Sequence, residues 1–453
     1  MSAVLHDASH GPMIWRFIRH QSGVLPQGAP ILIYRLLIGP ALALILLWAW
    51  VRGKETRTSL AERLVIGSMT SRRETPPTLS IWVHGASVGE LRAARHLITR
   101  LQEHSNFALV VTTNTASAQA MVSEWDVPRL HVARAPADAF GATARFLRRW
   151  RVAAQVTLEN ELWPNRMRVC RAHNLQVFGV GTRPPAALAR GKFAKRIAAQ
   201  SLGLYSRIWP LNSASRQSLA EVIPDARLDT AFNAKATVPA QPKGAPKSQV
   251  LAAWAGCDIV LAASTHAPEE RLLLDAYRQA LPKNPALRMI IAPRHPDRGP
   301  RLSRALTNND ISLACRSEGE QVHAHTNLYL ADTLHEMALW YHGAPRTIIG
   351  GTFAPKGGHT PVEPILAGSL PLHGPDCRNH QDMFDALDLA GGAILLRDQT
   401  ALIDQLATMM PEPMRRAKLA QGRDVVATLG ATAMAQSDAI ARYVAQQLNT
   451  GNP

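Results

Sequence analysis

At 453 residues the chain is about three times as long as a common domain, so its length predicts two domains of roughly 180 to 200 residues, each with a core of its own. Its composition, 46% apolar and 19% charged, is that of a globular protein, while 50 Lys and Arg against 34 Asp and Glu give a net charge of +16 that attracts nucleic acid, anionic lipid or a phosphorylated substrate. The basic residues form no basic–aromatic stripe, which speaks against nucleic acid, and the four cysteines form no CxxC pair, which argues against a zinc ribbon or a disulfide framework.

The first predicted element is an apolar segment at residues 31–51, ILIYRLLIGPALALILLWAWV, which is followed by three basic residues. Its uncharged part, Leu36 to Val51, is shorter than the roughly 20 residues that a straight membrane span needs. Aromatic residues near its ends suit a headgroup boundary, and the basic flank suits an anionic cytoplasmic leaflet. We therefore expect an interfacial or barely spanning membrane anchor, and the alternative is a buried core helix.

After this segment, short apolar runs alternate with helical patterns. In the first half, strands are expected at 79–83, 107–113, 152–158 and 175–181, with helices beginning near 91, 118 and 164. The pattern breaks at 238–248, VPAQPKGAPKS, which has the composition of a linker. It then resumes, with strands expected at 258–264, 287–293, 327–332, 347–351, 369–374 and 392–397 and a helix from about 413 to 448.

Strands that alternate with helices predict an α/β fold with parallel sheets covered on both faces. We expect two doubly wound, Rossmann-like domains that face each other across a cleft, with ligands at the carboxyl ends of the strands. The expected organisation is a tail and membrane anchor at 1–58, a first domain at 59–237, a linker at 238–248 and a second domain at 249–453, whose last helix packs back across the cleft.

Polar, glycine-rich loops follow several of these strands. The first, HGASVGE, spans His84 to Glu90, and its Ser87-x-x-Glu90 spacing is a capping box. In that motif the Ser hydroxyl and the Glu carboxylate each accept a hydrogen bond from an unpaired backbone N–H, which for Glu90 would be that of Ser87. The motif leaves open whether Glu90 only starts a helix or also does chemistry. Glu159 and Glu161 follow another strand, where one carboxyl pKa rises if both are partly buried, although exposed carboxylates are commoner.

The second half offers Ser264 to His266, Arg294 between two prolines, and GGTFAPKGGHTPVE at 350–363. The guanidinium of Arg294 matches the paired oxygens of a phosphate, or it is a surface group in a turn. The glycines of 350–363 let backbone N–H groups approach a phosphate, and Thr360, Pro361 and Glu363 are expected as N-cap, first helical residue and the end of a second capping box. A turn does not explain Lys356 and His359. Because no HExxH or DxD motif occurs, a catalytic metal is not supported.

Taken in order, these segments resemble the 3-deoxy-D-manno-octulosonic acid (Kdo) transferase family over nearly the whole chain. The resemblance implies a GT-B fold with an N-terminal membrane anchor, held at the cytoplasmic face of the bacterial inner membrane. It implies an inverting transfer of Kdo from CMP-Kdo to a lipid A precursor, lipid IVA, in lipopolysaccharide core biosynthesis, with no cofactor. The matching segments are YRLL, HGASVGE, TTNTASA, LENELWPN, AASTHAPEE, PRHPDR, DTLHEMALWY, GGTFAPKGGHTPVEP and HGP.

The resemblance also implies roles for individual residues. Glu90 falls where the family has its general base, and Glu159 and Lys235 fall on positions that stabilise the transition state. The sequence departs from the family's pattern at His335, where the family usually has Gly, and at Thr360, where it usually has Asn. The CMP-binding loops are matched by Pro293, Arg294, Leu334, His335, Glu336, Thr360, Pro361, Val362 and Glu363.

Two other interpretations stay open. One is a divergent paralogue that uses another acidic sugar or lipid acceptor, and the other is a membrane-associated binding protein that has lost catalysis. The departures at His335 and Thr360 motivate the second. In the leading interpretation the partners are CMP-Kdo, a lipid A precursor and an anionic membrane surface, and no nucleic acid is expected.

Overall fold

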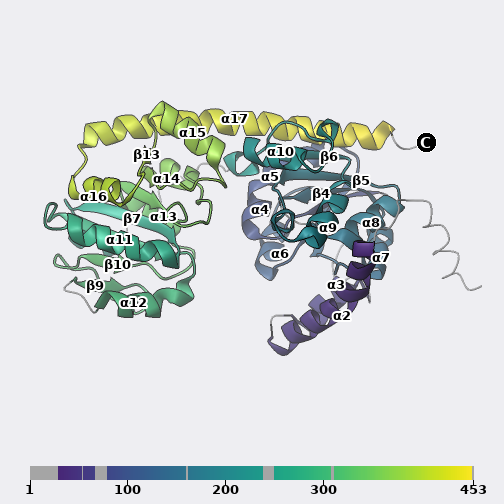
Figure 1. Ribbon diagram of the computed structural model, residues 1–453, viewed down its shortest axis with the longest axis horizontal. Helices are drawn as coiled ribbons and strands as arrows, with labels where there is room; N and C mark the ends of the chain where they lie inside the picture. Colours follow the sequence, from purple (N-terminus) through teal and green to yellow (C-terminus); the bar gives the residue numbers. More distant parts are fainter. Residues whose placement is uncertain are drawn as a thin grey trace, which may run out of the picture. The chain divides into compact units, whose positions relative to one another are not determined.

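The computed structural model describes residues 29–53, 55–66, 79–159, 162–237, 249–307 and 311–450. The chain divides into two compact units (Figure 1): unit 1 comprises residues 1–232 and 437–453, and unit 2 comprises residues 233–436. Lys235 therefore lies in unit 2, and the final helix α17 (Glu412–Thr450) begins in unit 2 and ends in unit 1. The predicted linker at 238–248 lies outside the described residues.

Unit 1 is built on a six-stranded parallel sheet of order β3-β2-β1-β4-β5-β6, the strand order of a doubly wound nucleotide-binding fold. Apart from the partly exposed edge strand β3, its strands are buried along most of their length because helices cover both faces. The strands are β1 (Ser80–His84), β2 (Ala108–Thr113), β3 (Leu130–Arg134), β4 (Val152–Leu158), β5 (Gln176–Thr182) and β6 (Arg207–Pro210).

The helices of unit 1 bury apolar residues at helical spacing. Leu97, Ile98 and Leu101 are the buried apolar residues of α5 (Arg95–His104). Trp82 of β1 packs against Phe146 on the face of the sheet. Tyr443, near the end of α17, packs edge-on against Phe178 and Trp209. The helices are α4 (Val88–Ala93), α5 (Arg95–His104), α6 (Ala116–Ser123), α7 (Phe140–Trp150), α8 (Pro164–Ala172), α9 (Lys192–Leu202) and α10 (Ser213–Ala220).

Unit 2 has a seven-stranded parallel sheet of order β13-β12-β11-β7-β8-β10-β9. Alternate residues of β7 enter the cores on the two faces: Val260 and Ala262 join one, and Leu261 and Ala263 join the other. This is why the strand reads as one continuous apolar run. The strands are β7 (Asp258–Thr265), β8 (Leu287–Pro293), β9 (Leu313–Cys315), β10 (Leu328–Leu330), β11 (Arg346–Ile349), β12 (Leu370–His373) and β13 (Ile394–Leu395).

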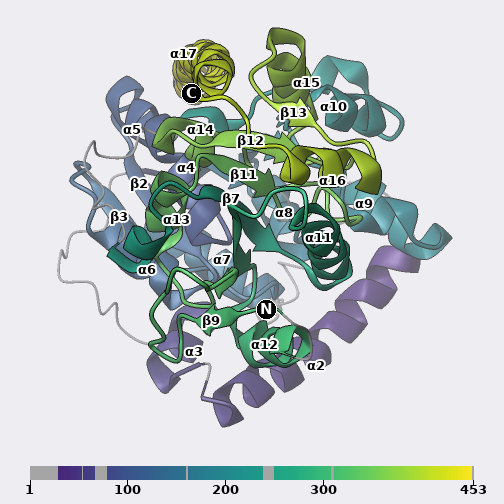
Figure 2. The ribbon, with the colours of Figure 1, turned by 90° about the vertical axis from the view of Figure 1, so that its left-hand side faces the viewer.

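Figure 2 shows α11 and α16 side by side on one face of this sheet and α13 and α14 on the other. The loops that leave β7, β8 and β11, which are neighbours in the sheet, therefore meet at one edge. The helices of unit 2 are α11 (Ala267–Ala280), α12 (Gly299–Thr307), α13 (Met337–Gly343), α14 (Val362–Ala367), α15 (Gln381–Ala390) and α16 (Gln399–Ala407).

The apolar N-terminal segment forms helix α2 (Ala29–Val51), which is followed by the short helix α3 (Arg57–Leu64). Tyr34 of α2 donates a hydrogen bond of 2.8 Å to the buried carboxylate of Asp138 in unit 1. Within the described residues, we find no helix with both the length and the apolar character that crossing a membrane requires.

Candidate active site

The loop between β1 and α4 holds the carboxylate of Glu90 through both of its oxygens. The Ala86 N–H donates to Oε2 at 2.8 Å, and the Ser87 hydroxyl donates to Oε1 at 3.0 Å. The Ser87 hydroxyl also accepts from the Glu90 N–H at 3.3 Å, as the capping pattern predicts. The backbone N–H on the carboxylate is that of Ala86, one residue before the expected Ser87. The helix start thus fixes where the carboxylate lies.

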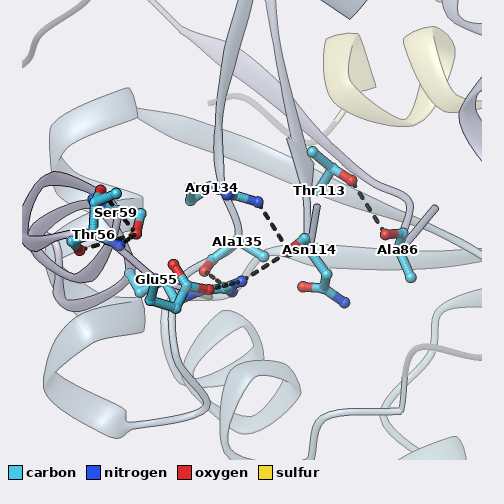
Figure 3. A network of polar contacts seen from close by, with 9 residues as sticks. Glu55, Thr56, Ser59, Ala86, Thr113, Asn114, Arg134 and Ala135 are labelled. Carbon is cyan, nitrogen blue, oxygen red and sulfur yellow. Dashed lines mark hydrogen bonds and ion pairs between the residues drawn. The ribbon is translucent and has the colours of Figure 1, made fainter. Parts of the chain in front are cut away.

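Gly85 is required in this loop because a side chain would not fit. A Cβ at this position would lie 2.8 Å from the Leu91 side chain and 3.1 Å from that of Leu158. The loop is also fastened to the next strand: the Gly85 N–H donates to the Thr112 carbonyl at 3.1 Å, and the Thr113 hydroxyl donates to the Ala86 carbonyl at 3.2 Å (Figure 3). The backbone that carries Glu90 is therefore tied to β2.

Glu159 follows the last residue of β4 in a left-handed conformation, with φ of 49°. Its N–H donates to the Val180 carbonyl at 2.9 Å, and its carboxylate lies 3.4 Å from a guanidinium nitrogen of Arg183. This ion pair between two loops at the carboxyl ends of β4 and β5 places Glu159 at the ligand-binding edge of unit 1. Glu161, the second carboxylate of the motif, lies outside the described residues.

In unit 2, the loops after β7 and β11 bring two histidines together. The Nε2 atoms of His266 and His359 are 3.2 Å apart, and the two rings are stacked with centroids 5.4 Å apart. His295, after β8, presents its ring edge-on to His266 at 6.4 Å. Since one nitrogen of the close pair must donate a proton to the other, at least one of the two rings is neutral.

Positive charge surrounds this pair. Burial, followed by the charges of His266, Arg294 and Lys235, lowers the pKa of His359 from its usual value to about 4. The pKa of His266 is also below its usual value, first because of burial and then because of nearby cations that include Lys356. An edge of a sheet at which cations gather around two partly buried rings, at least one of them neutral, attracts an anion such as a phosphate.

The glycine-rich loop after β11 is fixed by Glu269, which our sequence analysis did not single out. Its buried carboxylate accepts from the Gly351 N–H at 2.7 and 2.9 Å and from the His266 N–H at 2.8 Å. Glu269 forms a capping box with His266 as N-cap, and the pattern is inconspicuous because His rarely takes that role. The neighbouring Glu270 is held by two hydrogen bonds from Arg298, at 3.0 and 2.8 Å.

The residues predicted to bind CMP lie in three loops of unit 2. Pro293 ends β8, the Arg294 N–H donates to the Thr265 carbonyl at 3.0 Å, and the side chain of Arg294 is exposed. His335 has a φ of 67°, which explains why Gly is usual at this position in the family that the sequence resembles. Glu336 precedes α13, and its carboxylate accepts hydrogen bonds of 3.0 and 2.6 Å from Arg316.

The predicted cap of the next helix is wrong by one residue. The N-cap of α14 is Pro361, and Thr360 lies outside the helix. Its hydroxyl instead accepts from the N–H of Val362, the first residue of the helix, at 3.3 Å in a local turn that spans two residues. Glu363 lies in the first turn, where a carboxylate is favourable to the helix dipole.

In the part of the chain that the structure describes, no group of three or more His, Cys, Asp and Glu side chains is arranged to hold a metal ion. The chemistry that these residues themselves can supply is a fixed carboxylate at Glu90 in unit 1 and a cationic edge in unit 2. The first can take a proton, and the second can hold a phosphate.

Comparisons with known proteins agree with the resemblance of the sequence motifs. Residues 58–238 match the family model described as 3-deoxy-D-manno-octulosonic-acid transferase (kdotransferase). A 3-deoxy-D-manno-octulosonic acid transferase from Bordetella pertussis is 29% identical over 86% of this chain and 93% of its own. Another from Haemophilus influenzae is 26% identical over 74% of this chain and 79% of its own.

Solved structures also match parts of the chain. The C-terminal CMP-Kdo binding domain of WaaA from Acinetobacter baumannii is 31% identical and matches 40% of this chain and 95% of its own, with a TM-score of 0.38. An α,α-trehalose 6-phosphate synthase from Burkholderia multivorans matches 82% of this chain and 98% of its own at 12% identity, with a TM-score of 0.56. The second likeness concerns the fold alone, and together with the two parallel sheets it confirms the predicted pair of Rossmann-like domains.

Proposed function

The chain belongs to the 3-deoxy-D-manno-octulosonic acid (Kdo) transferase family, and from this premise we propose that it transfers Kdo from CMP-Kdo to the lipid A precursor lipid IVA, with inversion at the anomeric carbon. The observation that carries the proposal is the carboxylate of Glu90, which the Ala86 N–H and the Ser87 hydroxyl hold by both oxygens. A general base must be fixed in this way if it is to meet an acceptor hydroxyl.

In the proposed reaction the acceptor hydroxyl oxygen forms a bond to the anomeric carbon of Kdo. The bond from that carbon to the phosphate oxygen of CMP breaks, and CMP leaves with the electron pair. The hydroxyl proton goes to Glu90. An ionised carboxylate that already accepts two hydrogen bonds is a weak base, but the hydroxyl becomes acidic as the new bond forms, so proton transfer can follow bond breaking.

The cationic edge of unit 2 fits the donor. Lys235 and Arg294 lie close enough to His359 for their charges to lower its pKa. Positive charges stabilise the negative charge that develops on a departing phosphate. We assign CMP binding to the loops that contain Pro293 to Arg294, Leu334 to Glu336 and Thr360 to Glu363, and a stabilising role in the transition state to Lys235 and Glu159.

We further propose that the enzyme works at the cytoplasmic face of the inner membrane, with α2 at the bilayer surface. Leu44, Ile45 and Val51 of α2 have 67%, 57% and 71% of their surface exposed, and Arg52 stacks over Trp48 at 5.2 Å from its ring centroid. Exposed apolar side chains next to a Trp–Arg pair suit the boundary between lipid tails and anionic headgroups. A lipid acceptor is most accessible to an enzyme seated there.

The test is transfer by the full-length chain in a membrane fraction, with CMP-Kdo and tetraacylated lipid A precursor as substrates. CMP release and the mass of the lipid product are measured for the wild type, for Glu90→Gln and for Glu124→Gln, which changes an exposed carboxylate of the same unit. Glu90→Gln can keep a hydrogen bond from Ala86 but cannot accept the proton, so its kcat should fall by about 10² to 10⁴. Glu124→Gln should match the wild type.

If a folded wild-type chain releases no CMP from CMP-Kdo, the substrate assignment is wrong, and another acidic sugar or a non-catalytic role replaces it. If Glu90→Gln transfers Kdo at the wild-type rate, the assigned activity is correct but the general base is a different residue. The departures at His335 and Thr360 make the first outcome worth testing directly with other CMP-linked acidic sugars.

A further inference from the structure

Helix α3 belongs to unit 1 and contacts β3. Figure 3 shows Thr56 and Ser59 of its first turn in the same network of polar contacts as Asn114 and Ala86. The helix begins six residues after the end of α2 and is capped by Thr56, whose side chain and backbone exchange hydrogen bonds with Ser59. Its last turn is fastened at two places: the Ala137 N–H donates to the Arg63 carbonyl at 2.8 Å, and Arg145 of α7 donates to the Leu64 carbonyl. The last turn of α3 is thus fixed to the loop after β3 and to α7.

Arg63 reaches from this helix to the end of β2. Its Nη2 donates to the Asn114 carbonyl at 2.8 Å, and its Nε donates to the Glu55 carboxylate at 2.8 Å. Arg63 and Glu55 keep only 14% and 9% of their side-chain surface exposed, so water competes little for this pair. Arg134, from β3, donates to the same Asn114 carbonyl at 2.9 Å. Two guanidinium groups therefore converge on one carbonyl oxygen.

Asn114 in turn holds the loop of Glu90. Its N–H donates to the Ala86 carbonyl at 3.4 Å, beside the hydrogen bond from the Thr113 hydroxyl to the same oxygen. The N–H of Ala86 is the donor to Oε2 of Glu90. A continuous series of hydrogen bonds thus connects Arg63 to the proposed base through two backbone segments, Asn114 and Ala86.

From these contacts we propose that Arg63, on α3, is a positioning residue for Glu90, acting through Asn114 and Ala86. This rests on the proposed function, in which Glu90 accepts the proton. Arg63 itself touches neither substrate. Its effect is on where the carboxylate stands, and a displacement of about 1 Å in a catalytic group lowers a rate by as much as 10²-fold.

The experiment compares Arg63→Ala and Arg63→Lys with Arg145→Ala in the full chain. Arg145 is a matched control because it also binds a carbonyl of the last turn of α3 but contacts Leu64 and Val65 rather than Asn114. We expect kcat to fall about 10- to 100-fold in Arg63→Ala, several-fold in Arg63→Lys and by less than about twofold in Arg145→Ala. The KM for CMP-Kdo should stay within about twofold, because the proposed donor loops belong to unit 2.

A double-mutant cycle separates positioning from stability. If Arg63 acts through Glu90, adding Arg63→Ala to Glu90→Gln should lower kcat by no more than about twofold further. A full additional loss in that background, an equal loss in Arg145→Ala, or a wild-type kcat in Arg63→Ala overturns the proposal. Should Arg63→Ala not fold, Arg63→Lys decides in its place: an unchanged kcat overturns it. A wild-type chain without transferase activity, or an active Glu90→Gln, instead identifies a failure of the proposed function.

Discussion

The partly buried His359 makes the stability of unit 2 depend on pH. In the folded chain its pKa is lowered from 6.5 to about 4, mainly by burial and then by the charges of His266, Arg294 and Lys235. Between these two pH values the histidine is protonated in the unfolded chain but not in the folded chain. The free energy of unfolding therefore falls as the pH falls through 6.5, and it levels off below about pH 4. Over the whole range the free energy of unfolding changes by about 1.36 kcal/mol for each unit of difference between the two pKa values, which gives roughly 3 kcal/mol.

Between pH 7.5 and pH 5.0 the same linkage amounts to about 2 kcal/mol, because at pH 5.0 the unfolded histidine is nearly fully protonated and the folded one is not. His359→Gln, which keeps an uncharged polar group facing His266, should remove that dependence. We would measure urea unfolding of the full chain at both pH values and identify the transition of unit 2 by hydrogen exchange of its strand amides. His325→Gln, an exposed site in the same unit, is the control.

The expected result is that the wild type and His325→Gln lose about 2 kcal/mol more than His359→Gln between pH 7.5 and pH 5.0. Parallel losses in all three proteins would refute the reasoning, since His359 would then titrate alike in the folded and unfolded chains. A smaller loss in His325→Gln than in the wild type would also count against it, because the effect would not be specific to the buried ring.

Two further predictions concern backbone strain and the membrane. His335→Gly should raise the free energy of unfolding by roughly 0.5 to 1 kcal/mol, because His335 has a φ of 67° and Gly takes this conformation without a steric cost; a destabilised variant in urea unfolding would show that the imidazole makes a contact worth more than the strain. Replacing Leu44 and Ile45 together by Asp should remove most of the chain from vesicles containing phosphatidylglycerol in a sedimentation assay at high salt, since each exposed apolar side chain contributes up to about 2 kcal/mol when lipid buries it. If the variant sediments with the vesicles as the wild type does, α2 does not hold the chain at the membrane surface.

Much of the fold could be predicted from apolar periodicity alone. Strands β4 and β8 begin and end at the predicted residues, because both are buried along most of their length and bounded by polar or turn residues. Three strands were missed. β9 has three residues, too few for a pattern, β6 ends in Pro210, and β3 is an edge strand in which His131 and Arg134 interrupt the apolar run. One side of an edge strand faces solvent, so the apolar pattern in its sequence is weaker.

The site was harder to predict than the fold. The family was confirmed, and the catalytic and CMP-binding roles of individual residues stay predictions. The motif placed His359 in a glycine-rich loop, but its pairing with His266, 93 residues away, depends on β7 and β11 being neighbours in the sheet. That strand order is not visible in the alternation of helices and strands. The misplaced N-cap at Thr360 has a local cause, because a Thr hydroxyl can satisfy a helix N–H two residues on as well as three.

Unit 1 is formed by two separate segments of the chain, and this has a consequence for biosynthesis. The face that Phe178 and Trp209 present to Tyr443 is completed only by residues 437–450, which the ribosome makes after every residue of unit 2. Domains generally fold as they emerge, N-terminal parts first. Here the first unit to be translated is the last to be finished, so a nascent chain exposes an apolar face of unit 1 while unit 2 is being made.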